Sequence, residues 1–214
     1  MEDEITRSIG RLTNLWTYPV KSLRHVAHDS VEVLEDGLAG DRHAALFVAS
    51  EEHARSGKPY RGKEDNRLHL LSKPEEARRA ASDRGVNLEV RNGERYYDAG
   101  DVALIFDRWV GEVERGLGRR LDPLRWRPNL YAVASADFSE NDLVGARLQI
   151  GSVILRVVAP TGRCVTTTYD QETGESDGEV LRFVAQSRDN KMGVYCTVEQ
   201  TGTLSVGDRL LILP

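Results

Sequence analysis

Cysteine is almost missing from this chain, since only Cys164 and Cys196 occur among its 214 residues. Two cysteines are too few for a disulfide scaffold or a cysteine-rich zinc site. The five histidines are scattered without metal-ligand spacing, and we expect them on the surface or in the core. No apolar run approaches the ~20 residues that a membrane-spanning helix needs. The first residues are acidic and polar, unlike a secretory signal, so we expect a cytoplasmic protein without membrane association.

An excess of positive charge is also lacking, because 29 Lys and Arg face 34 Asp and Glu and give a net charge of −5. We therefore expect no nucleic-acid partner. Apolar residues make up 40% of the chain, enough for one globular unit, residues 1–214. The arginines are unevenly spread, and five of them fall within residues 115–127.

The apolar pattern favours many strands interrupted by a few helices. Strands are predicted at residues 9–18, 30–34, 44–49, 87–91, 96–97, 147–150, 153–158, 192–199 and 204–213. An Asn92-Gly93 turn is expected to join 87–91 and 96–97 as a hairpin. Helices are predicted at 74–84, 107–117 with Asp107 as N-cap, and 178–188, and a long polar loop at 51–66. This pattern predicts a mainly β or α+β domain, with a closed or half-closed barrel and a few peripheral helices.

The segment around Cys164 has the pattern of a reactive thiol at the junction of a strand and a loop. Pro160 and Gly162 indicate a turn after the strand, and Arg163 directly precedes the cysteine. A neighbouring cation favours thiolate, the form that attacks electrophiles and ligates soft metals, and the following hydroxyls and loop N–H groups could bind an anion. The alternative is a small, buried, inert cysteine. Cys196 instead has the alternating spacing of a strand face, which predicts a core position.

Six short motifs occur in an order that resembles the MOSC domain family, named after the C-terminal domain of molybdenum-cofactor sulfurase. They are YPVKS at 18–22, GLAGDR at 37–42, RWRPN at 125–129, RCVTTTYDQETG at 163–174, GVY at 193–195 and GD at 207–208. The resemblance implies a MOSC-type β-barrel, with an N-terminal barrel-like portion at about 5–105 and a MOSC core at about 106–214. Many members carry a second cysteine three residues before the reactive one, where this chain has Thr161.

The resemblance also implies that Cys164 ligates molybdenum in a bound molybdenum cofactor, whose phosphate needs local cations. The residues predicted to bind this cofactor are Lys21, Ser22, Arg42, Arg125, Arg127, Asn129, Arg163 and Thr167. Each has an ordinary alternative: Arg42 could simply pair with Asp41, for example. Arg119 and Arg120 are predicted to be surface residues. The sulfurase owes its desulfurase activity to a separate pyridoxal-phosphate domain, for which 214 residues leave no room.

Three functions remain open at this point. The first is an oxidoreductase that reduces N-oxygenated small molecules, with Cys164 as metal ligand and a partner protein as electron donor. The second is a sulfur carrier that accepts a persulfide on Cys164 from a sulfur-donor protein. The third is a cofactor-binding module without turnover. Whether the protein is an enzyme is therefore not decided by its sequence.

Overall fold

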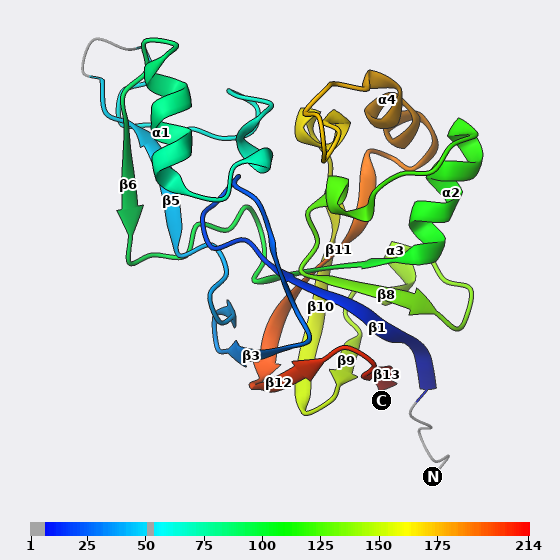
Figure 1. Cartoon of the computed structure of the whole chain (residues 1–214). Coiled ribbons are helices and arrows are strands. Elements are labelled where there is room, and N and C mark those ends of the chain that lie inside the picture. Colours follow the sequence, from blue (N-terminus) through cyan, green and yellow to red (C-terminus); the bar gives the residue numbers. More distant parts are fainter. Residues whose placement is uncertain (1–6, 51–53) are drawn as a thin grey trace.

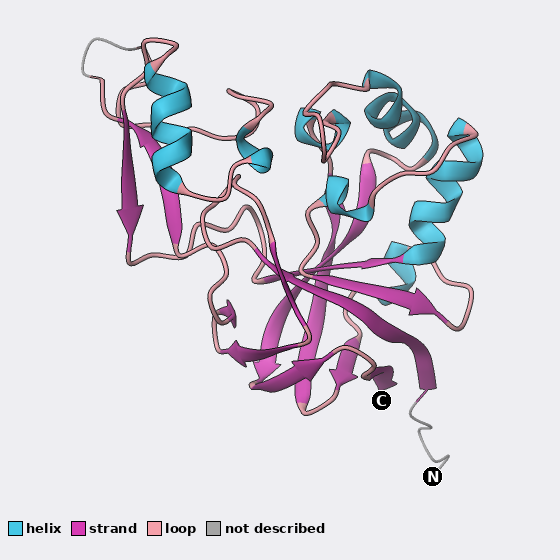
Figure 2. Cartoon of the chain, in the orientation of Figure 1, coloured by secondary structure: helices cyan, strands magenta, loops and turns pink. Residues whose placement is uncertain are grey.

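The computed structural model describes residues 7–50 and 54–214, so the polar start of the chain and the first three residues of the predicted 51–66 loop lie outside the described residues (Figures 1 and 2). Seven strands close a mixed barrel, as the predicted fold class requires. In barrel order these are β1 (Arg7–Thr17), β8 (Leu130–Ala134), β7 (Val102–Phe106), β11 (Lys191–Gln200), β10 (Val153–Gly162), β9 (Arg147–Ile150) and β13 (Arg209–Leu213), which pairs back with β1. A short strand, β2 (Val26–His28), extends the sheet beyond β1.

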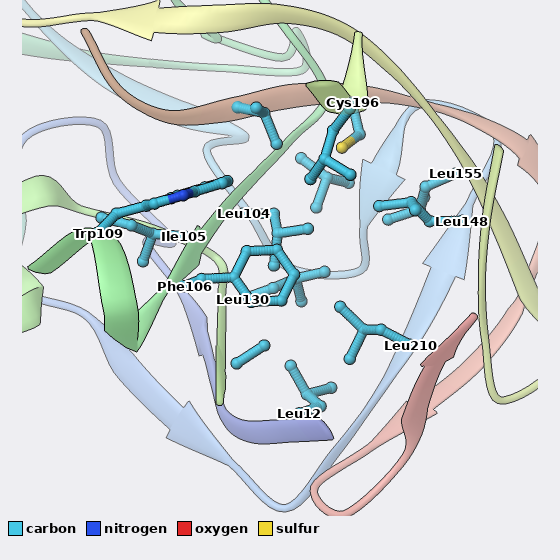
Figure 3. Packing of buried hydrophobic residues seen from close by; sticks show 14 of the residues in the cluster. Leu12, Leu104, Ile105, Phe106, Trp109, Leu130, Leu148, Leu155, Cys196 and Leu210 are labelled. Atoms are coloured by element: carbon cyan, nitrogen blue, oxygen red, sulfur yellow. The ribbon is translucent and has the colours of Figure 1, made fainter. Parts of the chain in front are cut away.

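The barrel encloses the larger of two apolar clusters (Figure 3). Alternate side chains along the barrel strands point into this cluster. Strand β7 is buried along its whole length. Phe106 packs edge-to-face on Trp109 and Phe138, with ring centroids 5.0 and 4.9 Å apart. Cys196 is fully buried in this cluster, which confirms its predicted core position.

Three predicted helices are confirmed. They are α1 (Pro74–Ser82), α2 (Asp107–Leu117) and α4 (Gly178–Ser187), and a short α3 (Glu140–Leu143) adds one further turn. Helix α2 crosses over between β7 and β8, the parallel pair of the barrel. Asp107 is not the N-cap, which is Phe106. The Asp107 carboxylate instead accepts hydrogen bonds from the backbone N–H groups of Arg108 and Ala134, at 2.7 and 2.9 Å.

A second unit lies beside the barrel and has its own small core (Figure 1). It consists of β5 (Ala44–Val48) paired with β6 (Leu88–Asn92), packed against α1. The predicted hairpin between 87–91 and 96–97 is wrong, because the apolar β5 supplies the partner for β6. Residues 96–97 bind the 36–42 segment instead: Tyr96 N–H donates to Arg42 O at 2.8 Å and Tyr97 Oη donates to Asp36 O at 2.6 Å.

The predicted C-terminal strand 204–213 is two strands on different sheets. β12 (Gly202–Ser205) pairs with β3 (Ser30–Leu34), which also pairs with β4 (Gly37–Leu38), whereas β13 joins the barrel. The break falls at Gly207, whose φ of +98° ends the extended backbone.

The N-terminal portion was predicted at about 5–105, and its described residues contribute strands to the main barrel. Its strands β1 and β7 complete the same closed sheet as the strands of the C-terminal portion. None of the helices formed by residues 7–50 and 54–214 has the length and apolar character that crossing a bilayer demands.

Candidate functional site

A cavity of about 380 Å³ opens where one end of the barrel meets the second unit. Most of its wall comes from the barrel side. The contributing segments are the turn after β1, the 3-10 turn η2 (Pro123–Trp126), the end of β10 with the following 3-10 turn η3 (Val165–Thr168), Ala103 of β7 and Tyr195 of β11. The second unit contributes residues 61–63 and His69 from the other side. Eight of the nine predicted site residues line this cavity: Lys21, Ser22, Arg42, Arg125, Arg127, Arg163, Cys164 and Thr167. Their roles toward a ligand remain predictions.

Cys164 follows the last residue of β10 by two positions and is exposed, in contrast to the buried Cys196. Its Sγ lies 3.2 Å from Thr166 Oγ1, and its backbone carbonyl accepts a hydrogen bond from Thr167 Oγ1 at 2.8 Å. The thiol therefore lies exposed at the N-terminal end of η3 and is not packed in a core. Burial raises the pKa of Cys196 to about 12, so that thiol stays protonated.

Arg163 positions the thiol loop through backbone carbonyls. Its guanidinium donates to Trp126 O at 2.7 Å and, through Nε, to Met192 O at 2.8 Å. Burial lowers the pKa of Arg163 to about 10, so the group remains charged at neutral pH. Gly193 permits this arrangement: its φ is +83°, and a Cβ there would lie 2.9 Å from Leu104 O and 3.3 Å from Arg163 Nη2.

Two further, partly buried arginines lie over the ring of Tyr18. Arg127 lies 4.2 Å and Arg42 4.7 Å from the ring centroid, and both have positive φ. Arg42 also forms an ion pair with the buried Asp41, which was the alternative to cofactor binding expected for it from the sequence. Burial lowers the pKa of Arg127 to about 10. Burial also acts to lower the pKa of Arg42, but the charge and hydrogen bond of Asp41, together with Tyr18 and Asp98, outweigh it and raise that pKa. Arg42 is thus both an ion-pair partner and part of the cavity wall.

The other predicted cations are tied into the wall. Lys21 Nζ pairs with Asp98 at 2.6 Å, and Ser22 follows it with a φ of +74°. Arg125 donates to Thr168 O at 2.6 Å and so fixes η3 from behind. Arg119 and Arg120 lie away from the cavity in surface ion pairs, which confirms their prediction.

Asn129 is the exception among the predicted residues, because it does not line the cavity. Its Nδ2 donates to Trp16 O at 3.1 Å, its Oδ1 accepts from Ala103 N–H at 3.1 Å, and Arg42 Nη1 lies 3.3 Å from the same oxygen. The amide joins β1 to β7 and supports Arg42. The direct contact of Asn129 with a ligand stays a prediction, one that this position does not favour.

Sequence reasoning missed the wall that the second unit provides. Arg61, Gly62 and Lys63 lie in the segment predicted only as a polar loop, and His69 was expected in the core or on the surface. His69 Nε2 donates to Asp170 O at 2.7 Å and its ring is nearly parallel to that of Tyr169. Two cations around a glycine at 61–63 were the available signal for an anion site.

The cavity is strongly cationic and contains polar atoms without partners. Of the residues that the structure describes, seven Lys and Arg side chains and one carboxylate, that of Asp98, line it. The seven are Lys21, Arg42, Arg61, Lys63, Arg125, Arg127 and Arg163. Trp126 Nε1, Thr161 Oγ1 and Arg125 Nε are buried and make no hydrogen bond with the described residues. Buried polar groups of this kind are costly unless a ligand or water satisfies them. The arrangement suits a polar, anionic ligand with a soft acceptor beside Cys164.

The family model of the MOSC domain matches residues 97–211, more than half of the chain. Mitochondrial amidoxime-reducing component 1 of Danio rerio is 34% identical over 122 residues, which cover 53% of this chain and 37% of that protein. Molybdenum cofactor sulfurase of Drosophila mojavensis is 29% identical over 112 residues, 47% of this chain and 14% of that protein. The match thus spans little more than a third of the length of the amidoxime-reducing component and about a seventh of that of the sulfurase.

Two solved structures share the fold. YuaD of Bacillus subtilis superposes with a TM-score of 0.56 at 14% identity, covering 97% of this chain and 98% of that one. YiiM of Escherichia coli gives 0.53 at 11% identity, covering 97% and 71%. The barrel, the cationic cavity with its exposed cysteine and the match over residues 97–211 agree: this chain belongs to the MOSC domain family.

Proposed function

We propose that this protein binds molybdenum cofactor through Cys164 and reduces N-oxygenated small molecules. The observation that carries the proposal is the position of the exposed Cys164 in a cavity with seven cationic side chains and one carboxylate. Among the described residues lining this cavity, Cys164 supplies the one thiol. Thiolate is a soft ligand that suits molybdenum better than the oxygen donors around it.

The residues present fit this cofactor, which has a pterin and a phosphate. The cavity volume of about 380 Å³ is within the usual range for small-ligand pockets. Arg42, Arg127 and Lys21 are the cations expected to hold the phosphate, since arginine matches phosphate geometry well. The unpaired donors Trp126 Nε1 and Arg125 Nε offer hydrogen bonds to polar groups of the ligand.

When bound, the cofactor supplies a two-electron redox centre. The overall reaction breaks the N–O bond of an N-hydroxylated substrate: two electrons and two protons give N–H and water. The electrons come from a partner protein with a redox group, which is part of the proposal. The chain's own contribution is to hold Cys164 at the cavity mouth, through the Arg163 bonds to Trp126 O and Met192 O. The relative whose name includes amidoxime reduction supports this choice of substrate.

The exposure of Cys164 also favours a second candidate, a sulfur carrier. In that reaction the Cys164 thiolate attacks the outer sulfur of a donor persulfide. The donor's S–S bond breaks, the donor leaves as a thiolate, and Cys164 becomes the persulfide. No net oxidant is required, because the sulfane sulfur is only transferred.

The experiment is an assay of benzamidoxime reduction to benzamidine, with a chemical reductant such as reduced methyl viologen in place of the partner. Wild type, Cys164→Ala and Cys196→Ala would be expressed in a host that makes molybdenum cofactor. We expect turnover by wild type and Cys196→Ala and none by Cys164→Ala. Turnover by Cys164→Ala at the wild-type rate would refute the role of this thiol. A sulfane-sulfur adduct on Cys164 without any turnover would support the carrier instead.

A further inference from the structure

The cations of the cavity fall into two groups, according to whether the protein already satisfies them. Those on the barrel side have close internal partners: Arg42 pairs with Asp41, Lys21 with Asp98, and Arg163 with backbone carbonyls. These contacts fix the side chains and partly neutralise them. They form a preorganised wall suited to a resident ligand.

Arg61 and Lys63, on the second unit, differ from that wall. Within residues 7–50 and 54–214, Lys63 makes no hydrogen bond or ion pair, and its side chain is exposed. Arg61 Nε is buried without a hydrogen bond and makes a long ion pair, of 3.8 Å, with Glu64. Glu64 also pairs with Arg55, at the shorter distance of 2.8 Å. The second unit therefore offers the cavity the unpaired charge of Lys63, beside an Arg61 whose one carboxylate partner among the described residues is shared with Arg55.

This charge lies close to the thiol. A Cβ on Gly62 would be 3.1 Å from Thr166 Cγ2, so the 61–63 backbone packs directly on Thr166. The hydroxyl of Thr166 in turn lies 3.2 Å from Cys164 Sγ. Arg61 and Lys63 thus flank Gly62, the residue that packs on Thr166 of the Cys164–Thr166 pair. An anion bound here sits beside the reacting end of the cavity.

We propose that Arg61 and Lys63 form a recognition site for an anionic group on the substrate, so that preferred substrates are N-oxygenated compounds bearing a carboxylate or phosphate. The proposal rests on the proposed function for its N-oxygenated centre. Arginine and lysine at a partly enclosed rim attract anions and raise their local concentration, even though the chain as a whole has a charge of −5. Gln171, which also lines the cavity, leaves its Oε1 unused in the described residues while its Nε2 donates to Tyr169 O.

The test compares 4-carboxybenzamidoxime with neutral benzamidoxime on the molybdenum-loaded protein. Calorimetric titration without reductant gives the Kd of each compound, so that binding is measured apart from turnover. We expect the anionic compound to bind wild type more tightly, and Lys63→Ala to weaken its Kd by about three- to tenfold relative to the neutral compound. Lys63→Glu is expected to reverse the charge preference. This variant should bind the cationic compound 4-(aminomethyl)benzamidoxime more tightly than 4-carboxybenzamidoxime. Lys58→Ala, an exposed lysine of the same unit that does not line the cavity, is the matched control.

Equal effects of Lys63→Ala on both compounds would overturn the inference. So would loss of molybdenum from Lys63→Ala or Arg61→Ala, because it would assign the pair to the cofactor and not to the substrate. If the loaded wild type reduces neither compound with reduced methyl viologen, the proposed function fails. The titration still decides the anion preference in that case.

Discussion

Arg163 donates a 2.7 Å hydrogen bond to the backbone carbonyl of Trp126. This bond joins the segment that carries Cys164 to η2, the turn that precedes Arg127. A second bond, to Met192 O, ties the same guanidinium to β11. Both sides of the cavity wall are thereby held by one side chain, whose planar shape allows several bonds at once.

Arg163→Lys is expected to lower the free energy of unfolding by about 1–3 kcal/mol, because lysine cannot reach both carbonyls and one is left without a donor. Urea unfolding measures this loss. Arg156→Lys, on the preceding strand β10, is the control: Arg156 is half exposed and pairs with Glu199, so its change is expected to cost below about 1 kcal/mol. Equal costs at the two positions would contradict the structural role of Arg163.

Gly193→Ala is expected to destabilise the protein by about 1–3 kcal/mol more than Gly40→Ala does. Both glycines have nearly the same positive φ, +83° and +81°, so the backbone strain of alanine is matched. Nothing lies within 4 Å of a Cβ at Gly40, whereas at Gly193 the Cβ meets Leu104 O and the Arg163 guanidinium. Thermal and urea unfolding of the two variants give the difference. Similar losses would show that the close approach to Arg163 does not matter.

Much of this fold could be predicted from the sequence, because local patterns specify local elements. The apolar face of residues 107–117 predicted a helix with the observed bounds. Cys164 does follow a strand, but the predicted turn at Pro160 and Gly162 is wrong, because β10 continues through Gly162 and pairs there with β11. Strands β7 and β8 were missed, and their pairing across α2 is set by the closed barrel, which no local period encodes. The predicted strand at 96–97 is wrong for the same reason: the pairing of β6 is not local, because its partner β5 lies about forty residues upstream.

The site divides in the same way. Residues in contiguous motifs, such as Arg125, Arg127 and Cys164, were predicted and do meet at one cavity. Asn129 does not line the cavity, because a motif does not show which way a side chain faces. Arg61 and Lys63 were missed because their nearness to the thiol results from packing of the second unit on η3, through Gly62 and Thr166.

Acid is expected to destabilise the protein in part through His69. Burial lowers the pKa of His69 below its ordinary 6.5, so the unfolded chain binds more protons between the two pKa values. Stability therefore rises with pH in that window, and it is lost as the pH falls from about 6.5 through the folded-state pKa.

His69→Gln can retain the hydrogen bond to Asp170 O without a titrating ring. We expect its free energy of unfolding to fall less than that of wild type between pH 7 and pH 5, as measured by urea titration at each pH. His43→Gln, at an exposed histidine, is the matched control. A pH dependence of His69→Gln identical to that of wild type would show that this ring does not contribute.

Asn129→Ala is expected to lower the free energy of unfolding by about 2–4 kcal/mol, since the buried Trp16 O and Ala103 N–H both lose a partner. Arg42 also loses a nearby acceptor, so cofactor retention is expected to decrease with it. Unfolding curves and molybdenum content measured on the same preparation separate the two effects. A variant of wild-type stability that loses cofactor would mean that Asn129 contacts the ligand after all.

The most direct test of the central claim is the molybdenum and pterin content of freshly purified protein from a host that makes molybdenum cofactor. Wild type, Cys164→Ala and Cys196→Ala would be compared, since the two cysteines differ in exposure. We expect near-stoichiometric molybdenum in wild type and in Cys196→Ala, and its loss from Cys164→Ala. Molybdenum absent from all three proteins, or retained in Cys164→Ala, would contradict the role of Cys164 as the molybdenum ligand.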